Sequence, residues 1–375
     1  MTSTSRKNYL YSLDWVRALT IAAVVMVHSV RFALVPADPL AGRLLQVLVQ
    51  FGRVSFMIVT GFIIAYQYRE RTPRWTSFFK RRAKSSGAPY LLWLILFLAL
   101  AMPVWPVMPF VGRLSRVLFT GYGHLYYLII TFQMYLLAPV LVWALRKSGR
   151  RVMWLGFLGI LWEVLSWTMS GYFHERSWTP ALFVSTYVGY FVIGGALGYE
   201  WDRYGAWMAD HRRYFTYGLA PTAAMATAMF FLNLHWLGAQ AAVNEFQPMS
   251  AIYCLSITAM LLASGTWFEK MRSERSTLAS GVSLVADASF GIYLVHPLFV
   301  HGWLHVAQWL GIALNAYVNT AVTLSLGLGL SVAMVAAIRL LPFSEWVIGT
   351  ARRPAARVVS ANATEGTGSK AATAS

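Results

Sequence analysis

Residues 13–28 of the chain read LDWVRALTIAAVVMVH, a mostly apolar stretch. It opens an apolar run, residues 13–35, that is long enough to cross the hydrocarbon core of a bilayer as a helix. The run nevertheless contains Asp14, Arg17 and His28. Ionisable side chains inside a membrane are costly, and they normally face the interior of a helix bundle. The stretch therefore predicts a membrane helix whose polar face lies against other helices of a bundle.

The composition extends this prediction to the whole chain. Of its 375 residues, 58% are hydrophobic and only 12% are charged, and the mean hydropathy is +0.54. Hydrocarbon offers backbone polar groups no hydrogen-bond partners, so spanning segments must be helices or closed barrels, and runs of about 20 apolar residues select helices. We therefore predict an all-α polytopic membrane bundle of about ten transmembrane helices, over residues 13–35, 45–67, 88–109, 124–145, 152–170, 181–199, 214–234, 249–268, 286–309 and 315–341.

The loop charges indicate the orientation. Lysine and arginine concentrate in every second connection, whereas residues 234–248 and 310–315 contain neither. By the positive-inside rule, both termini are cytoplasmic and the protein is a multi-pass protein of the cytoplasmic membrane. The net charge of +17 is spread over short loops, so we expect no nucleic-acid partner. We expect a transmembrane domain over residues 1–345 and a polar, disordered cytoplasmic tail over residues 346–375.

Helical periodicity places the polar residues of the first run on one face. Arg17 and His28 are eleven residues apart, about 20° more than three full turns, and Asp14 is close enough to pair with Arg17. One interpretation is an interfacial ion pair with a structural histidine, and the other is a polar track that leads to a general base, His28. Asp14 lies about 21 Å from His28 along the axis. A carboxylate that orients His28 must therefore come from another helix, and our candidate is Glu163.

Two later runs carry further candidates. Ser289, Tyr293 and His296 follow i, i+4, i+7 spacing and share one helix face. They form either a polar helix contact or part of a substrate site, with Tyr293 or His296 as donors to an oxyanion. His124 opens the fourth run at its outer end, as an interfacial residue or as part of an acceptor site. We expect no metal, because no glutamate or cysteine completes a ligand set beside the histidines of the ninth run.

The stretch YRERTPRWTSFFKRRAKSSGAPY, residues 68–90, is the densest cationic segment. Positive charge at this position is explained by membrane topology alone. Arginine and lysine also bind phosphate groups, so Arg81, Arg82 and Lys84 are candidates to hold the phosphates of an anionic cytoplasmic donor. The two explanations are compatible.

Several stretches together resemble the acyltransferase-3 family of bacterial membrane O-acyltransferases. They are LDWVRALTIAAVVMVH, MIVTGFII, FFKRRAKSSGAPYLLW, HLYYLIITFQMYLLAPVL and ASFGIYLVHPLFV, which follow one another in family order over nearly the whole chain. The resemblance implies about ten spans, a cytoplasmic acyl-CoA donor that is usually acetyl-CoA, and a hydroxyl acceptor. That acceptor is a surface polysaccharide of the intercellular adhesin type, a glycolipid, or the sugar of a secondary metabolite.

The first arginine of the paired-arginine motif of this family corresponds to Arg82. The second is replaced by Ser85, and Thr60 stands where serine is common. The first departure leaves less cationic charge for the donor than the family pattern provides.

The resemblance also assigns roles. The arginine and the catalytic histidine of the family correspond to Arg17 and His28, and its late tyrosine and histidine correspond to Tyr293 and His296. The predicted protein is thus an O-acetyltransferase-type enzyme in which His28 takes the proton of the acceptor hydroxyl as it attacks the thioester. The alternative is a transporter or flippase for a glycan or lipid-linked sugar, although the sequence lacks the repeated halves typical of many transporters.

Overall fold

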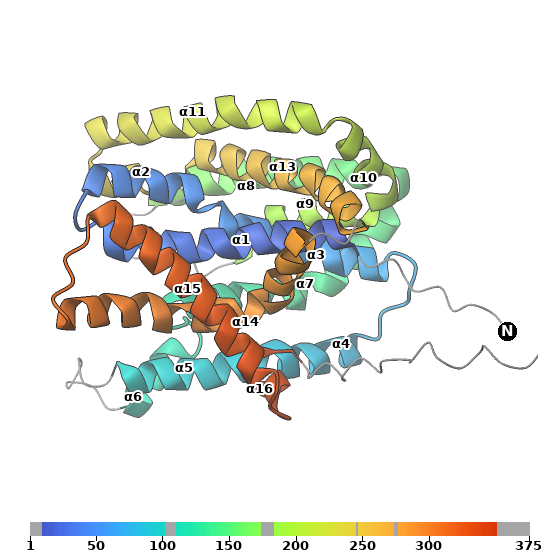
Figure 1. The fold of residues 1–375 in the computed structure, drawn as a ribbon. Helices are drawn as coiled ribbons and strands as arrows, with labels where there is room; N and C mark the ends of the chain where they lie inside the picture. The colour runs from blue at the N-terminus through green and yellow to red at the C-terminus, as the bar shows by residue number, and fades with distance from the viewer. Residues whose placement is uncertain (1–9, 102–109, 174–183, 245–246, 274–276, 351–375) are drawn as a thin grey trace, which may run out of the picture.

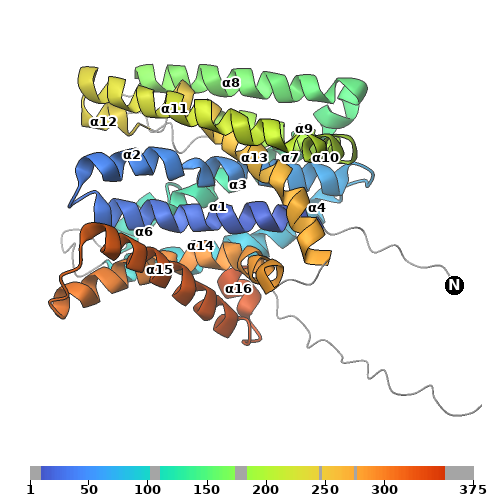
Figure 2. The ribbon, with the colours of Figure 1, turned by 45° about the horizontal axis from the view of Figure 1, so that its top comes forward.

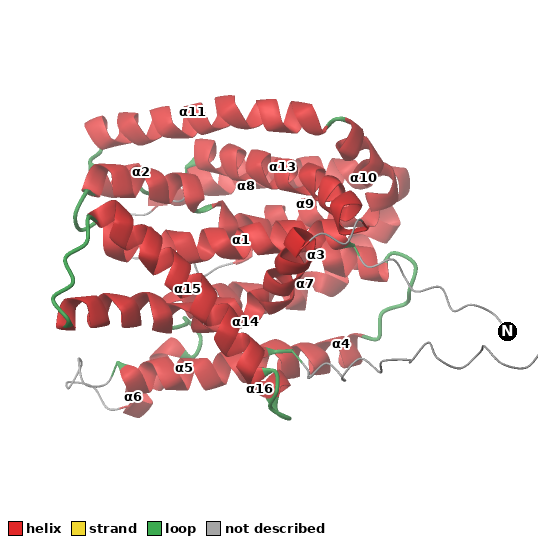
Figure 3. Ribbon diagram, viewed as in Figure 1, coloured by secondary structure: helices red, strands yellow, loops and turns green. Residues whose placement is uncertain are grey.

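The computed structural model describes residues 10–101, 110–173, 184–244, 247–273 and 277–350. Over these residues the regular structure is helical throughout, with no strand (Figure 3). The predicted all-α architecture is therefore confirmed. Parts of two predicted spans, residues 102–109 and 181–183, lie outside the described residues, as do residues 351–375 of the predicted tail.

The helices occupy the ten predicted runs. Within the described residues, eight helical segments are long and apolar enough to cross a membrane, and two shorter apolar helices, Val152–Ser166 and Val188–Tyr199, fill the remaining two runs. The protein is thus a multi-pass membrane protein. The helices are α1 (Tyr11–Ser29) with its π-helical extension η1 (Val30–Leu34), α2 (Pro39–Val49), α3 (Phe51–Tyr68), α4 (Trp75–Arg82) with the π-helical η2 (Ala83–Gly87), α5 (Ala88–Leu100), α6 (Phe110–Val117), η4 (Gly123–Leu125), α7 (Tyr126–Ser148), α8 (Val152–Phe173), α9 (Val188–Tyr199), α10 (Trp201–Asp210), α11 (Arg212–Trp236), α12 (Ala239–Ala242), α13 (Pro248–Ser273), α14 (Thr277–Trp309), α15 (Ala316–Ile338) and α16 (Ser344–Ile348).

Helix α1 lies inside the bundle between two hydrophobic clusters. Leu13 and Val16 belong to a cluster built mainly from α3, α7, α9 and α13. Ile21 and Val25 belong to a second cluster built mainly from α5, α14 and the start of α7. Figure 2 shows α1 between α3 and α14. This central position keeps the polar side chains of α1 within the protein and away from lipid.

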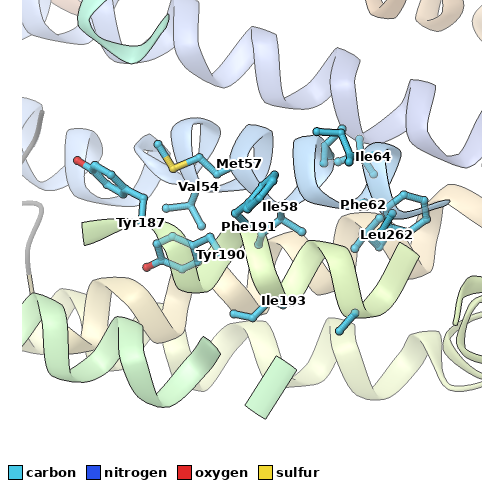
Figure 4. Packing of buried hydrophobic residues seen from close by; sticks show 14 of the residues in the cluster. Val54, Met57, Ile58, Phe62, Ile64, Tyr187, Tyr190, Phe191, Ile193 and Leu262 are labelled. Carbon is cyan, nitrogen blue, oxygen red and sulfur yellow. The ribbon is translucent and has the colours of Figure 1, made fainter. Parts of the chain in front are cut away.

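Helices α3 and α9 approach closely because glycine residues face each other's backbones. A Cβ atom at Gly194 of α9 would lie 1.9 Å from the carbonyl oxygen of Ile58, and one at Gly61 of α3 would lie 2.0 Å from the carbonyl oxygen of Phe191. Figure 4 shows the side chains of Ile58 and Phe191 at this contact. Small residues allow membrane helices to pack backbone against backbone. The α3–α9 pair is therefore a closely packed part of the bundle, and α1 contacts the same hydrophobic cluster.

The basic connections gather at one end of the bundle. The start of α1, the α3–α4 connection and α10 all lie at the right-hand end in Figure 1, which agrees with the predicted single cytoplasmic face. At that end α16 packs against the bundle, and its Ile348 is fully buried. Residues 346–350 therefore belong to the folded bundle, which corrects the predicted domain boundary at residue 345.

Candidate active site

A cavity of about 550 Å³ lies at the end of α1 that the charge pattern assigns to the outer side. We call it the outer cavity. His28 lines it, followed by Arg31 and Phe32 on the π-helical η1. Single π-helical turns are rare and are frequent at functional sites. Most of the other lining residues belong to α1, α2, α3, α7, α12 and α14, and the rest lie directly beside these helices. They are Val24, Val27, Val35, Gln46, Val49, Gln50, Gly52, Arg53, Phe56, His124, Tyr126, Tyr127, Gln240, Val243 and Tyr293.

Three histidines from three parts of the chain lie close together: His28 and His124 line the outer cavity, and the buried His296 lies beside both of them. The ring centroid of His28 lies 5.0 Å from that of His296 and 6.3 Å from that of His124, and the centroids of His124 and His296 are 5.2 Å apart. The His28 ring also lies 6.2 Å from the ring of Phe32. Periodicity predicted the helix faces of His28 and His296, and the fold brings these two residues together with His124.

The hydrogen bonds of His296 define its tautomer. Its Nδ1 atom lies 2.8 Å from the carbonyl oxygen of Tyr293 and 3.1 Å from that of Ile292. Carbonyl oxygens only accept hydrogen bonds, so Nδ1 carries the proton and Nε2 of the neutral ring carries a lone pair. His296 is fully buried, and among the described residues its Nε2 has no hydrogen-bond partner. A proton acceptor is therefore held beside His28.

The hydroxyl group of Tyr293 donates a hydrogen bond of 2.5 Å to the backbone carbonyl oxygen of His124. Its single proton is thereby engaged. We predicted Tyr293 or His296 as the oxyanion donor, but in this arrangement neither has a hydrogen to offer. The two predicted oxyanion donors therefore have other hydrogen-bonding roles in this structure. Among the described residues, Nε2 of His124 is buried without a partner.

A second cavity of about 300 Å³ lies on the cytoplasmic side of the first, and we call it the inner cavity. Arg17 and Ser289 line it, as does Arg82 at the end of α4. Arg17 donates a hydrogen bond of 3.1 Å to the hydroxyl oxygen of Ser289. The guanidinium of Arg82 lies over the ring of Tyr135, 4.8 Å from its centroid. The inner cavity thus presents two guanidinium groups.

The two cavities share a wall of three aromatic side chains. Phe56 of α3, Tyr127 of α7 and Tyr293 of α14 line both the outer and the inner cavity. We call these residues the shared wall. His28 lies on one side of it and Arg17 on the other, so the polar face of α1 serves both cavities.

Asp14 is buried near the cytoplasmic end of α1. Its Oδ2 atom accepts a hydrogen bond of 3.1 Å from the hydroxyl group of Ser283 on α14. Asp14 does not line either cavity. Its contact with Ser283 indicates that it helps to fix α1 against α14.

The predicted donor-binding cations occupy different positions. Lys84 forms an ion pair of 2.5 Å with Glu345 of α16, and Arg81 donates a hydrogen bond of 3.3 Å to the hydroxyl oxygen of Tyr68. Of the three predicted cations, only Arg82 lines the inner cavity.

Glu163 does not orient His28, contrary to our prediction. It is fully buried between α8 and α9, where its Oε1 atom accepts a hydrogen bond of 3.1 Å from the backbone N–H of Tyr190. The described ring neighbours of His28 are Phe32, His124 and His296. The prediction was based on the similar depths of Glu163 and His28 in the membrane. Depth alone does not specify which helices are neighbours.

Several lining residues were not recognised from the sequence. Arg53 lines the outer cavity and donates a hydrogen bond of 2.9 Å to the hydroxyl oxygen of Tyr126. Gln46 and Gln50 lie one turn apart and line the same cavity. A polar residue inside an apolar run was the signal that could have identified these lining residues. They lie near the outer end of their run, however, where they resemble ordinary residues of the membrane interface.

Comparison with known proteins identifies the family of the chain. The family described as an acyltransferase domain matches residues 10–340. The chain therefore belongs to the acyltransferase-3 family and is a membrane acyltransferase. No curated protein and no solved structure gave a match. Among the described residues, no group of three or more His, Cys, Asp or Glu side chains is arranged to hold a metal ion.

Proposed function

We propose that the protein transfers an acyl group, in the simplest case acetyl, from cytoplasmic acyl-CoA to a hydroxyl group beyond the outer face of the membrane. The acceptor is a surface glycan, a glycolipid or the sugar of a secondary metabolite. The observation that carries this proposal is the shared wall, because it joins a cavity lined by arginines to a cavity lined by His28. Donor and acceptor would meet there.

The inner cavity suits the donor. Arg17 and Arg82 line it, and guanidinium groups bind phosphates through paired, charge-assisted hydrogen bonds. Arg17 and His28 are about 16 Å apart along the axis of α1. Acyl-CoA has its phosphates at one end and its thioester at the end of a long flexible arm. It can therefore remain bound at the cytoplasmic end while its thioester reaches the shared wall.

The outer cavity suits the acceptor and the general base. His28 removes the hydroxyl proton as the acceptor oxygen forms a bond to the thioester carbonyl carbon. The carbon–sulfur bond then breaks, and the proton passes from the imidazolium to the departing thiolate. The products are an ester and the free thiol of coenzyme A. Holding both substrates at the shared wall supplies much of the rate acceleration.

His296 orients His28 in this scheme. Its ring lies 5.0 Å from the ring of His28, and its Nε2 lone pair, which has no partner among the described residues, can accept the N–H of His28. The second ring nitrogen of His28 then presents its lone pair to the acceptor. His296 is thus a positioning residue, and it takes the role for which Glu163 was predicted.

Transfer of label from acetyl-CoA tests the proposal. Membranes that contain the protein are incubated with acetyl-labelled acetyl-CoA and an extract of surface glycans, and alkali-labile label in the glycan fraction is measured. We expect His28→Ala to abolish the label, whereas His235→Gln, at an exposed position on α11, retains it. Wild-type labelling by His28→Ala, at equal protein levels, would reject the role of His28.

The same preparation separates the enzyme from the transporter alternative. An acyltransferase releases coenzyme A thiol in proportion to the ester formed. Movement of a glycan across sealed vesicles without thiol release would instead support a carrier. The match to the acyltransferase-3 family favours the enzyme.

A further inference from the structure

We propose that the acceptor is anionic: a sugar that carries a carboxylate or phosphate group near the hydroxyl that is acylated. This inference rests on the proposed function and specifies the substrate class of the outer cavity. It depends on the charge and on the unpaired polar groups of that cavity.

The outer cavity is cationic. Arg31 and Arg53 both line it, and no aspartate or glutamate occurs among its lining residues in the described part of the chain. Within that part, Arg31 has no carboxylate partner, and its guanidinium lies 5.8 Å from the centroid of the Phe32 ring. The guanidinium group of Arg31 therefore brings a positive charge to the cavity, and a bound anion would offset that charge.

The nearby carboxylate of Asp38 is engaged elsewhere. Its Oδ2 atom accepts a hydrogen bond of 2.7 Å from the hydroxyl group of Tyr317, and its Oδ1 atom accepts one of 3.1 Å from the backbone N–H of Ala41. These bonds, chiefly that from Tyr317, lower the pKa of the Asp38 carboxyl group. Asp38 therefore stabilises the start of α2 and does not neutralise the cavity.

An unpaired amide group also points to a ligand. Gln50 lines the outer cavity, and its Nε2 atom is buried without a hydrogen-bond partner among the described residues. Buried polar groups are nearly always hydrogen-bonded, so a lone one requires an explanation. Gln46 lies one turn away on the same lining, and glutamine amides both donate to and accept from sugar hydroxyl groups.

The position of Arg31 relative to His28 gives the acceptor its geometry. The two residues are three apart, where the extension η1 follows α1, so their side chains project from the same side of the helix. A sugar whose anionic group contacts Arg31 would present a neighbouring hydroxyl group to His28. The aromatic rings of Phe32 and Tyr126 provide flat surfaces for the sugar ring.

Binding of three small probes tests the inference. Methyl glucuronide, glucose 1-phosphate and the neutral methyl glucoside are titrated into purified protein in nanodiscs, and the dissociation constants are compared. We expect the anionic probes to bind at least about tenfold more tightly than the glucoside, which is the gain typical of hydrogen bonds to a charged group. The two anions distinguish a carboxylate acceptor from a phosphate acceptor.

Variants of two arginines localise the effect. Arg31→Gln should remove most of the preference for anionic probes, whereas Arg43→Gln, at a half-buried position on α2 that does not line the cavity, should retain it. Equal binding of neutral and anionic probes, or equal losses in the two variants, would overturn the inference. Thioester cleavage by the same wild-type preparation is measured separately, so that failure of the proposed function is distinguished from a neutral acceptor.

Discussion

The hydroxyl group of Tyr293 donates a hydrogen bond to the backbone carbonyl oxygen of His124. This bond connects the middle of α14 to the turn before α7. Tyr293 lines both cavities and so belongs to the shared wall. The hydrogen bond therefore fixes the position of one residue of that wall.

Tyr293→Phe is therefore expected to impair both stability and catalysis. Removing the hydroxyl group removes one hydrogen bond to a carbonyl oxygen that also accepts from the backbone N–H of Tyr126, at a cost of about 0.5–1.5 kcal/mol in the free energy of unfolding. The looser wall should lower kcat about tenfold, since small errors of position are costly in catalysis. Thermal unfolding and thiol release measure the two effects. Tyr217→Phe, at an exposed position, is the control, and identical behaviour of the two variants would contradict the assignment.

His296→Ala should lower kcat about tenfold to a hundredfold through loss of His28 orientation, with little change in KM for acyl-CoA. His296→Asn should recover part of the activity if its amide occupies the place of the ring. Steady-state kinetics and the pH dependence of kcat separate this role from a purely structural one. A loss confined to KM, or to protein yield, would argue against positioning.

Adjacent cations on α4 should differ in their effect on the donor. Arg82 lines the inner cavity, whereas Arg81 contacts Tyr68 and does not. We expect Arg82→Gln to raise KM for acyl-CoA about tenfold, as expected for loss of a hydrogen bond to a phosphate. Arg81→Gln should change KM much less. Equal increases in the two variants would indicate a general effect of charge rather than a contact.

The contact between α3 and α9 provides a test of the fold. In Gly194→Ala the new methyl group would collide with the carbonyl oxygen of Ile58, and the helices must separate at a cost of about 1–3 kcal/mol. Gly218→Ala on α11 has open space around it and should be neutral or slightly stabilising. Melting temperatures in detergent compare the two. If both variants melt like the wild type, the close packing is not required.

Hydropathy was sufficient to predict most of the fold. Apolar runs locate helices because lipid excludes unpaired backbone groups. In the described part of the run at 181–199, a short 3-10 helix at Val184–Thr186 precedes α9, which begins at Val188. Residues 346–350 were assigned to the tail because a short helix such as α16 leaves no strong periodic signal.

The candidate site could be predicted only where one helix carries the pattern. The spacing of Arg17 and His28, and that of Ser289, Tyr293 and His296, places these residues on common faces. Periodicity does not specify which faces meet. The contacts between site residues of different helices could therefore be identified only from the three-dimensional structure.

The aromatic wall has a consequence for the cell. The inner and the outer cavity have the side chains of Phe56, Tyr127 and Tyr293 in common. Under the proposed function, an acyl unit would pass along these rings while its carrier stays on the cytoplasmic side. The cell would thus modify molecules outside the membrane with acyl groups made inside it.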